Sequence, residues 1–290
     1  MKIVRAAVIG DVVGEPGLKT LEEKLPGIIK DNAVDFTVVN GENSAEGFGM
    51  TEISFRRIID CGADVVTTGN HVWEKREFWQ ILETDDRILR PANYPSDSPG
   101  RGWLCLEKAG VSWVIINLQG RELMTPINCP FICFDKIIKS FTNSASKDHN
   151  LYTESGGPAL PGLFPVIIVD FHAESSREKE SLGYHIDGRA ALVAGTHTHV
   201  QTADGRLLPK GTAYITDLGM TGITDSVIGM DAKICMERMR KQVLYRMEPA
   251  ALPKDPETDL ETLNLPGIAV QGIITEFDAD SGKAVSIRRI

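Results

Sequence analysis

The stretch AALVAGTHTH, at residues 190–199, combines a predicted strand with the most informative polar cluster in the chain. Its first five residues are apolar, which is typical of a short buried strand. Gly195 and Thr196 then lead into His197 and His199. Because residues i and i+2 of an extended backbone point to the same side, both imidazoles can reach one small space. The stretch therefore predicts a strand that ends at a metal site.

Runs of the same kind recur upstream and predict a mixed α/β fold. Short apolar runs rich in β-branched residues, expected to be buried strands, lie at residues 4–9, 36–39, 65–68, 111–118 and 165–171. Helical patterns lie between several of them, at residues 18–30, 51–61, 74–83 and 133–141. We expect Thr51 to be the N-cap of its helix and Gly62 to follow the last turn. Such alternation predicts a mostly parallel sheet with helices on its faces.

Residues 102–118 depart from this alternation and have the pattern of a hairpin that turns at Ala109 and Gly110. The last third of the chain predicts a second sheet, with strands at residues 201–208, 212–216, 267–277 and 284–287, the last two joined through residues 278–282. Because the sequence has no internal repeat and no linker between domains, we expect residues 1–290 to form one domain. The polar, Gly/Pro-rich residues 143–162 predict an inserted loop, and residues 248–265 a second irregular region.

Composition limits the classes of function. The 290 residues are 42% hydrophobic and 24% charged, and no run approaches the roughly 18 consecutive apolar residues of a membrane span. The N-terminal residues lack a signal-peptide pattern, so we expect a cytoplasmic protein without a membrane partner. The net charge is −9, and the absence of a basic run disfavours an extended nucleic-acid surface. An anionic substrate would therefore need local positive charge, which bound metal ions can supply.

Potential metal ligands follow several predicted strands at the carboxyl ends, where ligands bind in open α/β sheets. They are Asp11, Glu42 and Asn43, Asn70 and His71, His172, and finally His197 and His199. Taken singly, Asp11 or Asn70 is more often a turn or cap residue than a metal ligand. Together, and with four of the six histidines at these positions, they predict a metal site. His149 and His185 lack this context and are expected to be structural or exposed.

The potential ligands are nitrogen and oxygen donors, which suit manganese, iron or zinc. The five cysteines are scattered and form no C-x-x-C pair, so neither a zinc ribbon nor a disulfide framework is expected. The ligand set is too large for one ion and suffices for two, with a bridging carboxylate and a bridging hydroxide. Two metals about 3.5–4 Å apart suit in-line displacement at phosphorus. The predicted chemistry is therefore phosphoester hydrolysis.

The motifs at the strand ends resemble those of the calcineurin-like metallophosphoesterases. The usual pattern there is D-x-H, G-D, G-N-H-D/E, a later H, and G-H-x-H. In this chain Val13 stands where D-x-H has its histidine, Glu42 replaces the bridging aspartate, and Val72 follows Gly-Asn-His. These departures match the YmdB-like phosphodiesterase subfamily. The chain resembles that subfamily at residues 10–14, 40–43, 68–71, 170–174, 195–204 and 211–217, and over nearly its full length.

The resemblance implies a calcineurin-like α/β fold, with two packed mixed β-sheets flanked by helices in αββα layers. It also implies a dinuclear site that holds iron, with manganese or zinc as alternatives. One metal would be held by Asp11, Glu42, Asn43 and His199, and the other by Asn70, His172 and His197, with Glu42 as the bridge. Asn43 would supply, through its amide oxygen, the ligand that Val13 cannot. His71 would stay uncoordinated and protonate the leaving alkoxide, or else only hydrogen-bond to the ligands.

The implied activity is that of a metal-dependent phosphodiesterase on small phosphodiesters, with 2′,3′- or 3′,5′-cyclic nucleotides as the expected substrates. A metal-bridging hydroxide would attack phosphorus. A phosphomonoesterase or nucleotidase on the same site is one alternative. A regulatory protein that uses the metal site mainly for signalling is another. The sequence leaves a homo-oligomer open.

Overall fold

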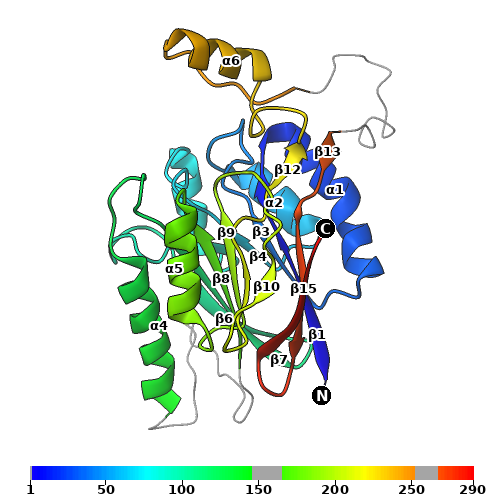
Figure 1. Cartoon of the computed structure of the whole chain (residues 1–290), viewed down its shortest axis with the longest axis vertical. Helices are drawn as coiled ribbons and strands as arrows, with labels where there is room; N and C mark the ends of the chain where they lie inside the picture. Colours follow the sequence, from blue (N-terminus) through cyan, green and yellow to red (C-terminus); the bar gives the residue numbers. More distant parts are fainter. Residues whose placement is uncertain (1, 146–164, 252–266) are drawn as a thin grey trace.

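The structure is a computed structural model that describes residues 2–145, 165–251 and 267–290, with the side chains of residues 141–145 left aside. Two six-stranded sheets pack face to face, and helices cover their outer faces (Figure 1). A third, three-stranded sheet lies beside them. The predicted αββα layering is therefore confirmed. Among the described residues, no helix combines the length and the apolar character needed to cross a membrane.

The first sheet contains the N-terminal strands. Its order is β15 (Lys283–Arg289), β14 (Gly272–Asp278), β1 (Ile3–Ile9), β3 (Phe36–Asn40), β4 (Val65–Thr67) and β5 (Ile88–Leu89). The strands β1, β3, β4 and β5 are parallel to one another, while β14 pairs antiparallel with both β1 and β15. The helices α1 (Gly14–Asp31), α2 (Glu52–Asp60) and α3 (Trp79–Thr84) contribute to the apolar cluster on its outer face.

The second sheet has a similar parallel centre. Its order is β10 (Arg206–Leu207), β11 (Ala213–Ile215), β9 (Leu192–Thr196), β8 (Val166–His172), β7 (Val111–Gln119) and β6 (Trp103–Lys108). The strands β7, β8, β9 and β11 are parallel, and β6 and β7 form the predicted hairpin through Ala109 and Gly110. The helices α4 (Pro130–Ala145) and α5 (Ser176–Ile186) cover its outer face. Both sheets thus direct the carboxyl ends of several strands toward one region.

The small sheet carries the first metal-ligand candidate. It consists of β13 (Ile268–Ala269), β12 (Met220–Ile223) and β2 (Asp11–Val12). Beyond β12 the chain enters α6 (Ala232–Lys241), which projects from the body of the molecule (Figure 1). A small apolar cluster that includes Val13, Met230 and Cys235 connects this projecting part to the body.

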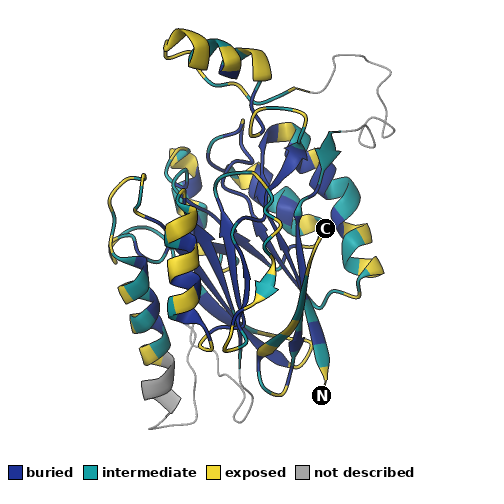
Figure 2. Ribbon diagram, in the orientation of Figure 1, coloured by how far each residue is buried: buried dark blue, intermediate teal, exposed yellow. Residues whose placement is uncertain are grey.

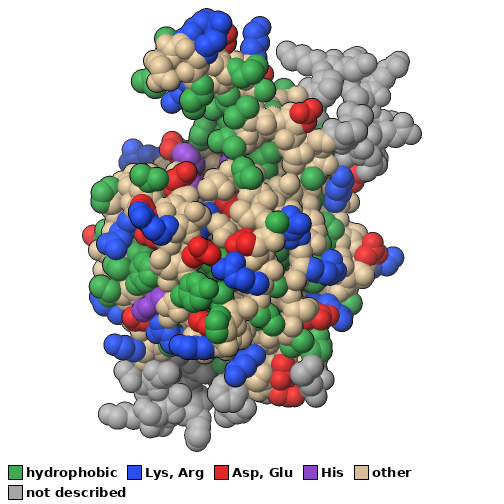
Figure 3. Space-filling model, viewed as in Figure 1, with side chains coloured by type: hydrophobic (Ala, Val, Ile, Leu, Met, Phe, Trp, Pro, Cys, Tyr) green, Lys and Arg blue, Asp and Glu red, His purple; other side chains and the backbone are tan. Residues whose placement is uncertain are grey.

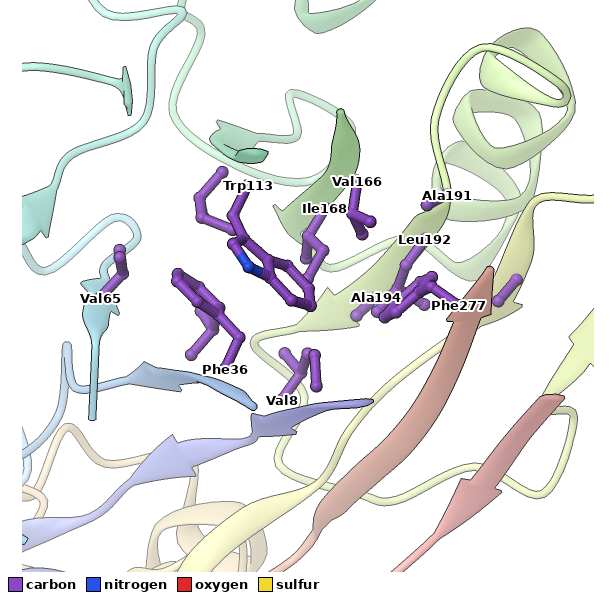
Figure 4. Close-up of a cluster of buried hydrophobic side chains, with 14 of the residues drawn as sticks. Val8, Phe36, Val65, Trp113, Val166, Ile168, Ala191, Leu192, Ala194 and Phe277 are labelled. Carbon is purple, nitrogen blue, oxygen red and sulfur yellow. The ribbon is translucent and has the colours of Figure 1, made fainter. Parts of the chain in front are cut away.

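The main core fills the space between the two large sheets. The ring of Phe36 stacks on Trp113 with 4.6 Å between ring centroids and 12° between planes, and Phe277 meets Trp113 edge to face (Figure 4). Val8 and Ile168 come from opposite sheets into the same cluster. Each fully buried side chain of this kind contributes about 1.5–3 kcal/mol to folding. Figure 2 shows the sheets as the most deeply buried layer, so the strand ends have a rigid base.

Several local predictions are confirmed and others need correction. Thr51 caps α2 by accepting a hydrogen bond from the backbone of Ser54, and Gly62 follows that helix with φ of +117°. The helix predicted at residues 74–83 is instead a 3₁₀ turn at Arg76–Phe78 followed by the short α3. α4 extends to Ala145, so the predicted loop at residues 143–162 begins inside a helix, and its part from residue 146 lies outside the described residues. Most of the region predicted as irregular at residues 248–265 also lies outside them.

Two predicted strands are shorter than expected because side chains bond to the backbone there. Of residues 201–208 only Arg206–Leu207 is a strand, since Asp204 accepts hydrogen bonds from Thr202 Oγ1 and from the backbone of Thr216. The run at residues 267–277 is interrupted between β13 and β14. At the break, Oε1 of Gln271 accepts from the backbone of Met220. The helices α5 and α6 were not singled out in the sequence.

Candidate metal centre

The eight predicted site residues lie at or just after the carboxyl ends of strands in the two large sheets. Asp11 comes two residues after β1 and begins β2, and Glu42 and Asn43 follow β3. Asn70 and His71 follow β4, His172 is the last residue of β8, and His197 and His199 follow β9. Hydrogen-bond and ion-pair distances below 4 Å link all eight into one cluster. The convergence predicted from the strand ends is therefore present in the structure.

One group of ligand atoms surrounds Nε2 of His172. This nitrogen lies 2.9 Å from Oε1 of Glu42, 3.0 Å from Oδ1 of Asn70 and 2.9 Å from Nδ1 of His197. An imidazole nitrogen carries at most one hydrogen, so it can donate to only one of these three atoms. A hydrogen bond to one of these atoms leaves the close approach of the other two unexplained. A cation shared by all four atoms would account for it. Glu42, His172 and His197 can bring ligand atoms within 4.8 Å of one another, which fits a metal ion.

A second group surrounds the amide of Asn43. Its Nδ2 lies 3.1 Å from Nε2 of His199, 3.3 Å from Oε1 of Glu42 and 3.5 Å from Oδ1 of Asp11. The two ends of an amide have nearly the same shape, so the oxygen can occupy the inward position instead. In that orientation four lone-pair donors face one another, one each from Asp11, Glu42, Asn43 and His199. Oε1 of Glu42 belongs to both groups, as expected of a bridging carboxylate.

Burial makes the charges of the cluster interdependent. Burial raises the pKa of Asp11 to about 6, although His199 and His172 oppose the shift. Burial also acts to raise the pKa of Glu42, but His172 overcomes it and holds that pKa at about 2. For His172, burial favours the neutral ring, but Glu42 and Asp11 raise its pKa to about 9. Without a cation, a proton on His172 would offset the charge of Glu42 and Asp11, and a bound cation would take over that role.

His197 is already in the form that binds metals. Burial, together with the positive charge on His172, lowers the pKa of His197 to about 3, so its ring is neutral near pH 7. Its Nε2 lies 3.0 Å from Oε2 of Glu174. A carboxylate at the second nitrogen of a ligating histidine fixes the ring and increases its basicity. Glu174 was not among the predicted site residues, although it lies two positions after His172.

A buried aspartate orients His172 from behind. Asp170 accepts hydrogen bonds from Thr67 Oγ1 at 2.5 Å, Thr196 Oγ1 at 2.7 Å and Asn40 Nδ2 at 3.0 Å. Thr196 Oγ1 also lies 3.0 Å from Nδ1 of His172. Because residues from β3, β4, β8 and β9 meet at this carboxylate, Asp170 joins the two large sheets beneath the cluster. In the sequence, Asp170 stands out only as part of a motif, without a role.

A buried ion pair holds the loop that carries the two histidines. Nζ of Lys179 donates to Oδ2 of Asp217 across 2.7 Å, and the same oxygen accepts from the backbone and the hydroxyl of Thr198. His197 and His199 on either side have φ of +102° and +63°. Non-glycine residues adopt such angles at a cost of order 1–3 kcal/mol, so the surrounding contacts must stabilise them. Neither Lys179 nor Asp217 was predicted as a site residue.

His71 lies at the rim of the cluster. Its backbone N–H donates to Oε2 of Glu42 across 3.2 Å, which fixes the position of the residue. Nδ1 of the ring lies 3.3 Å from Oε1 of Glu74, and the side chain is 25% exposed. The ring therefore lies outside the crowded ligand atoms and is accessible to solvent. His185, by contrast, lies outside the cluster and contacts Asp135 of α4 across 3.0 Å.

The αββα layers and the cluster of potential N and O ligands at the strand ends are those of a protein of the metallophosphoesterase class. The family model described as YmdB-like protein matches residues 7–290, and the chain belongs to that family. A Bacillus subtilis 2′,3′-cyclic-nucleotide 2′-phosphodiesterase is 39% identical over 287 residues, which cover 99% of this chain and 96% of the relative.

Solved structures support the same assignment. A hypothetical protein from Thermus thermophilus is 33% identical, with a TM-score of 0.80 and coverage of 99% of this chain and 98% of its own. A structure described as a novel phosphatase from Mycoplasma pneumoniae has a TM-score of 0.83 and 26% identity, and the match covers 100% of this chain and 93% of that one. The fold and the family are therefore established together.

Proposed function

We propose that this protein is a metal-dependent phosphodiesterase that hydrolyses cyclic nucleotides, with 2′,3′-cyclic substrates foremost. The relative from Bacillus subtilis has this activity in its name, and the alignment spans nearly both chains. One observation carries the proposal: Oε1 of Glu42 takes part in both groups of ligand atoms, 2.9 Å from His172 and 3.3 Å from Asn43. A carboxylate shared between two adjacent sites is what a dinuclear centre needs.

The two groups suggest how the ligands divide. Asp11, Glu42, Asn43 and His199 would hold one ion, and Glu42, Asn70, His172 and His197 the other. Iron is the ion that the resemblance implies, and manganese and zinc accept the same donors. Two such ions, when bound, would activate water for attack on phosphorus and neutralise charge on the group that is transferred.

His71 is suited to protonate the leaving oxygen. Its backbone is tied to Glu42, so the ring is held next to the cluster without being one of the crowded ligands. Glu74 contacts Nδ1, which orients the ring. An imidazole in such a position can hold a proton and release it to an alkoxide. Cleavage of the 2′ ester bond would place that alkoxide on the 2′ oxygen and leave a 3′-phosphate.

Hydrolysis assays on metal-loaded protein test the proposal. Protein purified with iron or manganese should hydrolyse a 2′,3′-cyclic nucleotide, and a chelator should abolish the activity. A 3′,5′-cyclic nucleotide and a nucleoside monophosphate at the same concentration provide the comparison. The structural similarity to a phosphatase makes phosphomonoester hydrolysis the second candidate. Faster release of phosphate from the monoester than hydrolysis of either cyclic diester would favour that second candidate.

A further inference from the structure

A pocket of about 660 Å³ opens beside His71, at the edge of the candidate metal centre. Residues of the segments 45–48 and 71–75 line one side, and residues 246–249 line the other. Its volume lies within the range of roughly 300–1,000 Å³ that is typical of small-molecule sites. Figure 3 shows histidine at the surface in the angle between the projecting α6 part and the body. A ligand in this pocket would contact the proposed proton donor.

The walls of the pocket are fixed by close packing. Gly49 has φ of +76°, and a Cβ at this position would lie 2.8 Å from Cβ of Glu74. Gly47 has φ of +83°, and a Cβ there would lie 2.7 Å from the ring of Pro249. The backbone of Asp231 also donates to the carbonyl oxygen of Glu248 across 2.8 Å. The three wall segments therefore touch one another, and the pocket exists before a ligand binds.

An aromatic ring stands between the pocket and the apolar cluster behind it. The ring of Phe48 meets His71 edge to face, with 5.2 Å between ring centroids. Phe48 is half-buried and packs against the cluster that contains Val13 and Met230. It thus has support from behind while it lines the pocket. Aromatic rings in such positions bind nucleobases by stacking.

The charges around the pocket favour an uncharged occupant. Lys75 and Arg246 are its cations, but three carboxylates lie in the same lining, those of Glu46, Glu74 and Glu248. Nζ of Lys75 is already 2.9 Å from Oε2 of Glu46. A second phosphate would therefore find no excess of positive charge here. The phosphodiester belongs at the metal centre, and the pocket suits the neutral part of the substrate.

We propose that Phe48 stacks on the nucleobase of a cyclic nucleotide, and that the pocket beside His71 holds the nucleoside. The inference rests on the proposed phosphodiesterase function and deepens it, because it assigns a residue that selects substrates with a base. Phe48 contributes to binding the base and takes no part in proton transfer. Its loss should therefore change KM rather than kcat.

The test compares two substrates that differ only in the base. One is 2′,3′-cyclic AMP, and the other is methyl riboside 2′,3′-cyclic phosphate, which has the same reacting group and no base. The variants are Phe48→Leu and Phe48→Trp. Phe131→Leu, which removes a half-buried ring from a separate pocket on α4, is the matched control. Thermal unfolding of each metal-loaded variant checks that the fold is intact.

Phe48→Leu should raise KM for 2′,3′-cyclic AMP about tenfold, because base stacking on an aromatic ring is lost. The base-free substrate should be unaffected, and Phe131→Leu should match the wild type on both. An equal rise in KM for both substrates, or no rise for either, would overturn the inference while leaving the phosphodiesterase function intact. A wild-type protein that hydrolyses neither substrate would overturn the proposed function and the inference with it.

Phe48→Trp decides the matter if Phe48→Leu does not fold. A larger ring face should lower or maintain KM for 2′,3′-cyclic AMP, and the base-free substrate should again be unaffected. If Phe48→Trp raises KM for both substrates to the same extent, stacking on the base is contradicted.

Discussion

Lys179 and Asp217 form an ion pair with 2.7 Å between Nζ and Oδ2, and each side chain is only 1% exposed. The aspartate also accepts from Thr198, which lies between the two histidines of the candidate metal centre. The pair thus connects α5 to the loop after β9. A charge this deep in the protein is tolerated because its partner and its hydrogen bonds compensate for lost hydration.

Lys179→Met should therefore destabilise the protein by about 3–5 kcal/mol, since Asp217 would remain buried without its cation. Urea denaturation monitored by fluorescence measures the change. Arg240→Met, which breaks the exposed pair with Glu237, is the control and should cost about 1 kcal/mol or less. Equal losses of unfolding free energy in the two variants would show that the buried pair stabilises the fold no more than an exposed one.

Glu174→Gln should weaken metal binding about tenfold, because carboxylate partners of ligating histidines contribute roughly 10- to 100-fold to affinity. The side chain contacts Nε2 of His197 across 3.0 Å and is itself 46% exposed, so folding should be unaffected. A competition titration with a chromophoric chelator reports the affinity. Glu180→Gln, on the following helix α5 and away from the cluster, serves as the control. Unchanged affinity in Glu174→Gln would mean that His197 needs no such orientation.

Removal of the proposed proton donor should affect catalysis without affecting metal content. His71→Gln should lower the rate on a 2′,3′-cyclic nucleotide by about 10²- to 10⁴-fold, which is the usual contribution of general acid catalysis. The rate on bis(p-nitrophenyl) phosphate should fall far less, since its leaving group departs without a proton. Comparable losses on both substrates would assign His71 to metal or substrate positioning instead.

Asn43 offers a test of the amide orientation. If its oxygen is a ligand, Asn43→Asp should keep the metal content of the wild type, because a carboxylate oxygen takes the same position. Asn43→Leu should lose one of the two ions. Elemental analysis of both variants after gel filtration gives the ratio of metal to protein. A full metal content in Asn43→Leu would remove Asn43 from the ligand set.

The strand ends were predictable because buried strands and metal ligands both leave local patterns. The run before His197 and the Gly-Asn-His motif around His71 each place a polar cluster directly after an apolar segment. Since parallel strands share one carboxyl edge, the convergence followed from the order of elements. The cap at Thr51 followed from the helix-start pattern. Two sheets were also expected, but residues 267–277 and 284–287 were assigned to the second one, whereas β14 and β15 pair beside β1 in the first.

The residues that support the site left no such pattern. Lys179 has the sequence context of an ordinary polar residue of an amphipathic helix, and only the packing of α5 on β9 buries it against Asp217. Asp170 lies in a predicted buried strand, but its partners Asn40, Thr67 and Thr196 come from three other strands, so the sequence alone does not reveal them. The pocket beside Phe48 is formed by segments about 200 residues apart in the chain, so a local pattern could not indicate it.

In the proposed centre, Glu42 joins two metal sites that act together. Stepwise addition of metal to the metal-free protein, with hydrolysis of a 2′,3′-cyclic nucleotide as the readout, tests this arrangement. Activity should reach its plateau at two equivalents of metal, and Glu42→Ala should neither bind the second equivalent nor recover activity. Full activity at one equivalent, or in Glu42→Ala, would contradict it.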